Sequence, residues 1–109
     1  MIATMEYINK IELCGIVGNV RIISATGKLA RFSLCVSNIY RTPEGDCTVD
    51  DTWFNCSAWE GKAIKDVTTI ISKKTAHIIG HVTTKRYLSA SENEFTTWEV
   101  ICDSVEIQD

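Results

Sequence analysis

The sequence predicts a single all-β domain with one helix: a five-stranded Greek-key barrel whose helix lies between the third and fourth strands. Three observations support this fold class. Five segments alternate apolar and polar residues with the period of two that is typical of strands. Glycines interrupt two of them, at Gly15, Gly18 and Gly80, as expected at the bends of a small barrel. One further segment changes to helical spacing.

The expected elements fill the 109 residues, a length that suits one domain with one core. An N-terminal arm occupies 1–8, and two long polar loops occupy 41–51 and 88–95. A turn at 24–28 and the loop around Pro43 are rich in turn-forming residues. The strands are expected at 9–23, 29–40, 52–59, 75–88 and 95–107, and the helix at 61–72.

The helix is expected because its apolar residues recur every three or four positions. They are Ala63, Ile64, Val67, Ile70 and Ile71. Lys73 and Lys74 follow, where cations interact favourably with a helix dipole. In the last strand, Trp98 has the same parity as Val100 and Cys102, so we expect its ring in the core.

The strand at 52–59 has one apolar face and one polar face that bears two tryptophans. The apolar face, which suits a core, consists of Phe54, Cys56 and Ala58. The other face consists of Trp53, Asn55, Ser57 and Trp59. Such a face needs a partner, either a flat nucleobase or another protein subunit. The order of three strands, one helix and two strands is that of the oligonucleotide/oligosaccharide-binding barrel (OB fold), whose ligands lie across its second and third strands.

The candidate contact residues are outward-facing aromatics and nearby cations. Trp53, Trp59, Tyr87 and Tyr40 are candidates for stacking on bases, and their alternative role is to fill a subunit interface. Lys85 lies two residues from Tyr87 on the same face, which suits a phosphate beside a stacked base. Surface cations are usually only solvated, but the further candidate phosphate contacts are Arg21, Arg31, Lys62, Lys73 and Lys74.

The overall composition excludes several classes of function. The net charge of −3 allows a basic path only locally, and it favours modest affinity or assembly of several chains around one strand. No catalytic motif is present, and His77 and His81 lie too far apart on one strand to share a metal, so we expect no enzyme, cofactor or metal. The five cysteines indicate reduced thiols in a cytoplasmic protein, and no segment is a signal peptide or a membrane span.

An ordered set of segments from 9 to 107 resembles the bacterial single-stranded DNA-binding protein family. They are Asn9–Leu13, Gly27–Leu34, Thr52–Asn55, Trp59–Ala63, Gly80–Tyr87 and Phe95–Thr97. The resemblance implies an OB-fold homotetramer that binds single-stranded DNA with little sequence preference in replication, recombination or repair. It implies base stacking at Tyr40, Trp53, Trp59 and Tyr87, with Lys62, Lys73 and Lys74 near the DNA.

The chain departs from that family in ways that leave alternatives open. Phe54 stands where the family often has a histidine that helps subunits assemble. The sequence ends at Asp109 without the acidic tip that recruits replication and repair enzymes, which suggests an accessory or tail-less member, dimeric in one such relative. The alternatives are an interaction module of a primosome or transfer complex with weak nucleic-acid binding, and an RNA-binding barrel.

Overall fold

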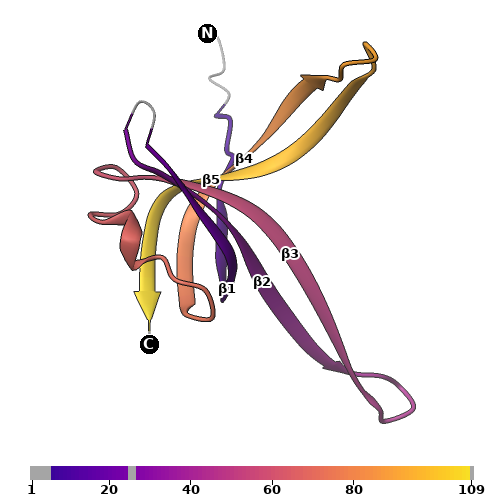
Figure 1. Cartoon of the computed structure of the whole chain (residues 1–109). Coiled ribbons are helices and arrows are strands. Elements are labelled where there is room, and N and C mark those ends of the chain that lie inside the picture. Colours follow the sequence, from indigo (N-terminus) through magenta and orange to yellow (C-terminus); the bar gives the residue numbers. More distant parts are fainter. Residues whose placement is uncertain (1–5, 25–26, 109) are drawn as a thin grey trace, which may run out of the picture.

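Five strands close into a barrel in the order β1–β2–β3–β5–β4 (Figure 1). The computed structural model describes residues 6–24 and 27–108, so parts of the expected arm at 1–8 and turn at 24–28 lie outside the described residues. Neighbouring strands are antiparallel, except that β3 and β5 pair in parallel over a short stretch. The strands are β1 (Ile11–Ile23), β2 (Leu29–Arg41), β3 (Cys47–Trp59), β4 (Thr75–Leu88) and β5 (Glu94–Gln108).

The core consists of inward-facing residues of all five strands, as the alternating pattern predicts, together with residues of the segment between β3 and β4. The largest fully buried side chains are Leu34, Ile78, Val17, Val67, Cys56 and Cys102. Burying one Leu or Ile side chain stabilises the folded state by about 1.5–3 kcal/mol relative to leaving it exposed. The Cys102 thiol, by hydrogen bonding, and burial together raise the pKa of Cys56 far above its ordinary value, so these thiols behave as small apolar groups.

The expected helix over 61–72 is wrong. In the part of the chain that the structure describes, this segment forms only one 3-10 turn, η1 (Val67–Thr69). The Asp66 carboxylate caps it by accepting a hydrogen bond from the Thr68 N–H at 2.9 Å, and Ile70 is already extended. Five consecutive β-branched residues from Val67 to Ile71 disfavour an α-helix because their χ1 freedom is restricted there.

The apolar spacing of this segment nevertheless identified the residues that it buries. Ala63, Val67 and Ile70 belong to the core cluster. Two hydrogen bonds fix the segment: the Val67 N–H donates to the Glu60 carboxylate at 3.0 Å, and the Val105 N–H donates to the Ala63 carbonyl at 3.0 Å. The periodicity therefore reported burial, but not the backbone conformation.

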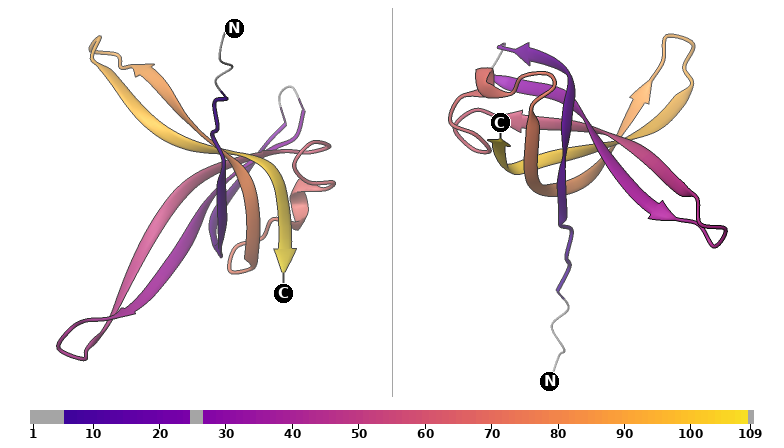
Figure 2. Two further views of the ribbon diagram at one scale, coloured as in Figure 1. Left: turned by 180° about the vertical axis from the view of Figure 1, so that it is seen from behind. Right: turned by 90° about the horizontal axis from the view of Figure 1, so that it is seen from below.

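Two hairpins extend from the barrel as long ribbons, β2–β3 and β4–β5 (Figures 1 and 2). The β2–β3 ladder continues without a break to the pair Arg41↔Cys47, so the loop expected at 41–51 is reduced to the turn at 42–46. The second loop, expected at 88–95, occupies 89–93. The polar composition of these segments predicted loops. Both faces of a ribbon that extends beyond the core are exposed to solvent, so its strands are polar as well.

Strand β1 changes partners along its length, which brings two regions of the sheet together. Its first half pairs with β4 up to Ile16, and from Ile16 onward it pairs with β2, with a bulge between Val17 and Val20. At Gly15 a Cβ would lie 2.2 Å from the Cys35 carbonyl oxygen, so only glycine permits this approach. The expected bend in the first strand is therefore observed. No helix within the described ranges has the length and apolar character needed to cross a membrane.

Candidate nucleic-acid interface

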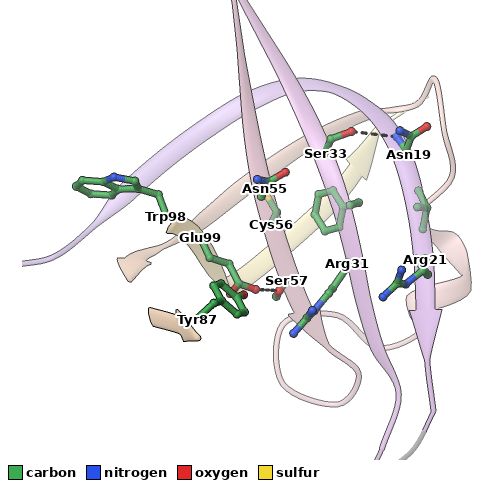
Figure 3. A pocket seen from close by; sticks show the side chains of 12 residues that line it. Asn19, Arg21, Arg31, Ser33, Asn55, Cys56, Ser57, Tyr87, Trp98 and Glu99 are labelled. Carbon is green, nitrogen blue, oxygen red and sulfur yellow. Dashed lines mark hydrogen bonds between the residues drawn. The ribbon is translucent and has the colours of Figure 1, made fainter. Parts of the chain in front are cut away.

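A groove lies over the outer face of β1, β2 and β3 and is bounded by residues of β4 and β5 (Figure 3). Its cavity volume is about 550 Å³. The polar residues and the exposed aromatic residues that line it are Asn19, Arg21, Arg31, Ser33, Asn55, Ser57, Tyr87, Trp98 and Glu99. These residues come from all five strands: two each from β1, β2, β3 and β5, and Tyr87 from β4.

Two arginines face each other in this groove without a carboxylate between them. The register pairs Arg21 with Arg31 across β1 and β2, and Arg31 with Ser57 across β2 and β3. Like charges directly opposite each other in an antiparallel pair are destabilising. Within residues 6–24 and 27–108, no carboxylate forms an ion pair with either guanidinium. This row therefore presents concentrated positive charge to whatever occupies the groove.

Glu99 is a buried acid beside this row. Its side chain accepts hydrogen bonds from the Ser57 hydroxyl and from the Lys85 ammonium, the latter at 2.7 Å, and the residue is only 9% exposed. Burial alone would raise the pKa of Glu99, but Lys85, Ser57 and the charge of Arg31 outweigh it and hold the pKa below its ordinary value. Glu99 is therefore ionised at neutral pH, and Lys85 is engaged with it.

Aromatic rings stand at the β4–β5 end of the groove. Tyr87 is 41% exposed and stacks on Phe95, its partner across the hairpin, with ring centroids 5.5 Å apart. Trp98 is 68% exposed, so the expectation that it lies in the core is wrong. Its parity is that of the core residue Val100, but the residues of β5 from Glu94 to Trp98 are exposed or half-buried, so this face no longer meets a core there.

Trp53 lies in a second hollow next to the groove, of about 430 Å³, which Trp98 also lines. The indole of Trp53 is 61% exposed. Its edge lies over Gly18, where an added Cβ would come within 2.8 Å of the ring. The glycine at the β1 bulge therefore leaves room for the Trp53 ring to lie across the sheet.

The other aromatic candidates lie outside these hollows. Trp59, at the end of β3, is 38% exposed. Its ring lies beside Gly27, where an added Cβ would be 3.6 Å from the nearest ring atom. Tyr40 is half exposed near the end of the β2–β3 ribbon, where it pairs with Thr48. The structure thus separates Tyr40 and Trp59 from the Tyr87, Trp98 and Trp53 group.

The lysine candidates also fall into two groups. Lys85 is held by Glu99 at the groove, whereas Lys62, Lys73 and Lys74 lie in the segment between β3 and β4 and do not line the groove. Lys73 donates its backbone N–H to the Val17 carbonyl at 2.7 Å with a positive φ of 76°. A helix C-terminus at Lys73 and Lys74 is therefore not observed.

The two histidines each have a carboxylate partner on a neighbouring strand. His77 contacts Glu12 at 2.6 Å and His81 contacts Asp103 at 3.3 Å. In the described ranges, no three His, Cys, Asp or Glu side chains are grouped so that they could hold a metal ion. All five cysteines are free thiols.

Sequence reasoning found several residues of the groove but missed others. It selected Arg21, Arg31 and Tyr87 as contacts, but it assigned no role to Glu99 and placed Trp98 in the core. The available signal was that Glu94 and Thr96, which precede Trp98 at the same parity, are both polar. No signal in the sequence pairs Glu99 with Ser57, since 42 positions separate them.

Solved structures of similar shape are single-stranded DNA-binding proteins. A Plasmodium falciparum SSB in complex with ssDNA is 19% identical, with a TM-score of 0.74 over 98% of this chain and 100% of the other. The small single-stranded DNA-binding protein of Streptomyces coelicolor is 17% identical, with a TM-score of 0.67 over 93% and 96%. A deletion mutant of the Thermus aquaticus single-stranded DNA binding protein is 11% identical, with a TM-score of 0.70 over 94% and 51%.

Sequence comparison gives no such relatives, since no protein-family model and no curated protein matches the chain. At identities of 11–19% the structural likeness is one of fold. The likeness extends over nearly the whole chain, as the ordered segments of the sequence predict. The chain has the barrel fold of these single-stranded DNA-binding proteins.

Proposed function

We propose that this protein binds single-stranded DNA with little overall sequence preference, by stacking bases on aromatic rings and holding phosphates with arginines. The observation that carries the proposal is the opposed pair of Arg21 and Arg31 beside exposed aromatic rings in one groove. Arginine is well suited to phosphate oxygens because its planar guanidinium donates several hydrogen bonds at once. An anion between the two guanidinium groups relieves their mutual repulsion.

A single strand suits this surface better than a duplex does. The rings of Trp53, Tyr87 and Trp98 are 61%, 41% and 68% exposed. Unpaired bases can stack on such rings, and each stacked base contributes about 1–3 kcal/mol. The bases of a duplex are already stacked on one another and offer no free faces. Trp59, Tyr40, Lys62, Lys73 and Lys74 are part of the proposal as contacts along a path beyond the groove.

The proposal includes the protein's assembly and setting. It acts as a non-enzymatic homo-oligomer, a tetramer or a dimer, in DNA replication, recombination or repair in the cytoplasm. Free thiols at all five cysteines support a reducing compartment. The proteins of similar fold are described as single-stranded DNA-binding proteins, and one of them was solved with ssDNA.

A second candidate is an interaction module whose hairpins dock on another protein. The observation that favours it is the exposed pair Ile39 and Val49, directly opposite each other on the β2–β3 ribbon and 72% and 56% exposed. The net charge of −3 favours it as well. In this case nucleic-acid binding is weak and the ribbon, rather than the groove, is the functional surface.

Titration of tryptophan fluorescence with oligo-dT at low salt tests the proposal. We expect quenching, because bases stack on Trp53 and Trp98, and an affinity that falls with added salt as phosphate counterions compete. The same oligonucleotide annealed to its complement is the control and should quench weakly. Native mass measurement with and without oligo-dT distinguishes the two candidates: unchanged fluorescence and no mass shift would favour the interaction module.

A further inference from the structure

The groove contains a buried negative charge, which is unexpected in a surface that binds a polyanion. Glu99 is 9% exposed and lines both the groove and the neighbouring hollow. A carboxylate removed from water is costly unless it is paired, and here Ser57 and Lys85 provide the pairing. Neither partner explains why the acid lies at the floor of the groove rather than on an exposed strand face.

Glu99 retains acceptor capacity beyond these two partners. An ionised carboxylate has about four lone-pair sites, two on each oxygen. Ser57 donates to one oxygen, Oε1, and Lys85 donates to the other, Oε2. One site on each oxygen therefore remains for a ligand. A carboxylate with one free site on each oxygen has the capacity to accept two N–H groups from one ligand, as carboxylates do from arginine.

The charges in the groove are separated along its length, and this orients a nucleotide. Arg21 and Arg31 lie on β1 and β2, whereas Glu99 comes from β5 near the rings of Tyr87 and Trp98 (Figure 3). A phosphate is attracted to the arginine end, whereas at the other end the positive charge of Lys85 is already offset by the Glu99 carboxylate. The base is thereby directed to the end where the aromatic rings and the acid lie.

The four bases differ in what their edges offer to a carboxylate. Guanine presents two adjacent donors, N1–H and the N2 amino group, which match the two oxygens of a carboxylate. Thymine presents one N–H between two carbonyl oxygens, and those oxygens are repelled by the acid. Cytosine and adenine present an amino group next to an acceptor ring nitrogen, so each offers one favourable contact and one unfavourable one.

We propose that Glu99, near Tyr87 and Trp98, forms a subsite that selects guanine within an otherwise sequence-tolerant groove. The proposal rests on the proposed single-stranded DNA binding and adds a base preference to it. Lys85 acts as a positioning residue, because its 2.7 Å contact holds the carboxylate at the floor of the groove. The low pKa of Glu99 keeps the acceptor charged at neutral pH.

Competition binding tests this subsite. Labelled dT15 bound to the wild-type protein is displaced with unlabelled dT15, with five repeats of dT-dT-dG, or with the same repeats containing inosine in place of guanine. Repeats allow a guanine to reach the subsite in any register. We expect the guanine strand to compete about tenfold better than dT15, as for one good bidentate base contact. The inosine strand, which lacks the N2 amino group, should be intermediate.

Variants assign the preference to the acid. In Glu99→Gln the amide cannot accept both donors, so the guanine and thymine strands should compete equally. Ser57→Ala is the matched control, because it removes a partner of Glu99 but keeps the carboxylate, and the preference should persist. Equal competition by all three strands in the wild type would overturn the subsite. A guanine preference that survives in Glu99→Gln would overturn the role of Glu99, whereas failure of dT15 to bind at all would overturn the proposed function first.

Discussion

Charged side chains are arranged differently on two parts of the barrel surface. Where β4 pairs with β1 and β5, each histidine has a carboxylate partner: His77 contacts Glu12 and His81 contacts Asp103. Where β1 pairs with β2, Arg21 faces Arg31. In the first region, both histidines already have carboxylate partners within the protein. The second leaves two exposed guanidinium groups opposite each other with no carboxylate partner within residues 6–24 and 27–108, which is the reason that we propose it as the binding surface.

The largest effect should follow from reversing the charge of the arginine pair. The double variant Arg21→Glu, Arg31→Glu places carboxylates against phosphates, and it should weaken oligo-dT binding by several kcal/mol, of order 3 or more. Fluorescence anisotropy at low salt measures this. The double variant Lys10→Glu, Lys65→Glu makes the same change in net charge away from the groove and is the control. Equal losses in both variants would mean that only the overall charge matters.

Removing one stacking ring should have the next largest effect. Trp53→Ala should cost about 1–3 kcal/mol of DNA affinity, as for one stacked base. The fold should persist because the indole is 61% exposed and lies outside the core. Circular dichroism checks the fold, and Trp53→Phe is the matched variant that should retain most of the affinity. An unchanged affinity in Trp53→Ala would mean that this ring lies off the path of the strand.

A smaller effect should come from displacing the ring without removing it. In Gly18→Ala the new Cβ would lie 2.8 Å from the Trp53 ring and 2.4 Å from the Ser33 hydroxyl, so one of them must move. We expect a loss of affinity of about threefold, less than the loss of a whole stacked base. Adding Ser33→Ala removes the tighter clash and leaves the one with Trp53. If affinity then returns fully, the position of Trp53 is not what Gly18 protects.

The buried acid of the groove should make stability depend on pH. Because the folded-state pKa of Glu99 lies below its ordinary value of 4.5, its ionised form stabilises the fold above that pH, and the contribution is lost as the pH falls through the folded-state pKa. Urea unfolding from about pH 7 down to about pH 3 should show the gap between wild type and Glu99→Gln closing in acid. A constant gap would show that the carboxyl is not ionised in the native protein.

The smallest effect should come from the paired region. Combining His77→Ala with His81→Ala removes two half-exposed histidine–carboxylate contacts, each of which contributes less than about 1 kcal/mol to stability. Oligo-dT affinity should stay within about twofold of the wild type, since neither histidine lines the groove. A marked loss of affinity would place the DNA path over β4 and would remove the distinction between the two regions.

The strands were predictable because the burial of alternate residues leaves a period of two in the sequence. Arg21 and Arg31 were predicted as separate contacts, but their position opposite each other was not. That register depends on the bulge between Val17 and Val20. The irregular segment between β3 and β4 was not predictable from spacing, because an irregular segment can bury Ala63, Val67 and Ile70 in the core as well as a helix can. Trp98 was assigned to the core because parity does not reveal where a strand leaves the barrel.

The barrel closes through a narrow seam. Strands β3 and β5 are joined only at Cys56↔Val100 and Ser57↔Ile101, and the side-chain bond from Ser57 to Glu99 spans the same place. A ligand in the groove lies across this join and contacts both sides of it. The melting temperature should therefore rise with the logarithm of ligand concentration, because DNA that binds only the closed barrel shifts the equilibrium away from its opening.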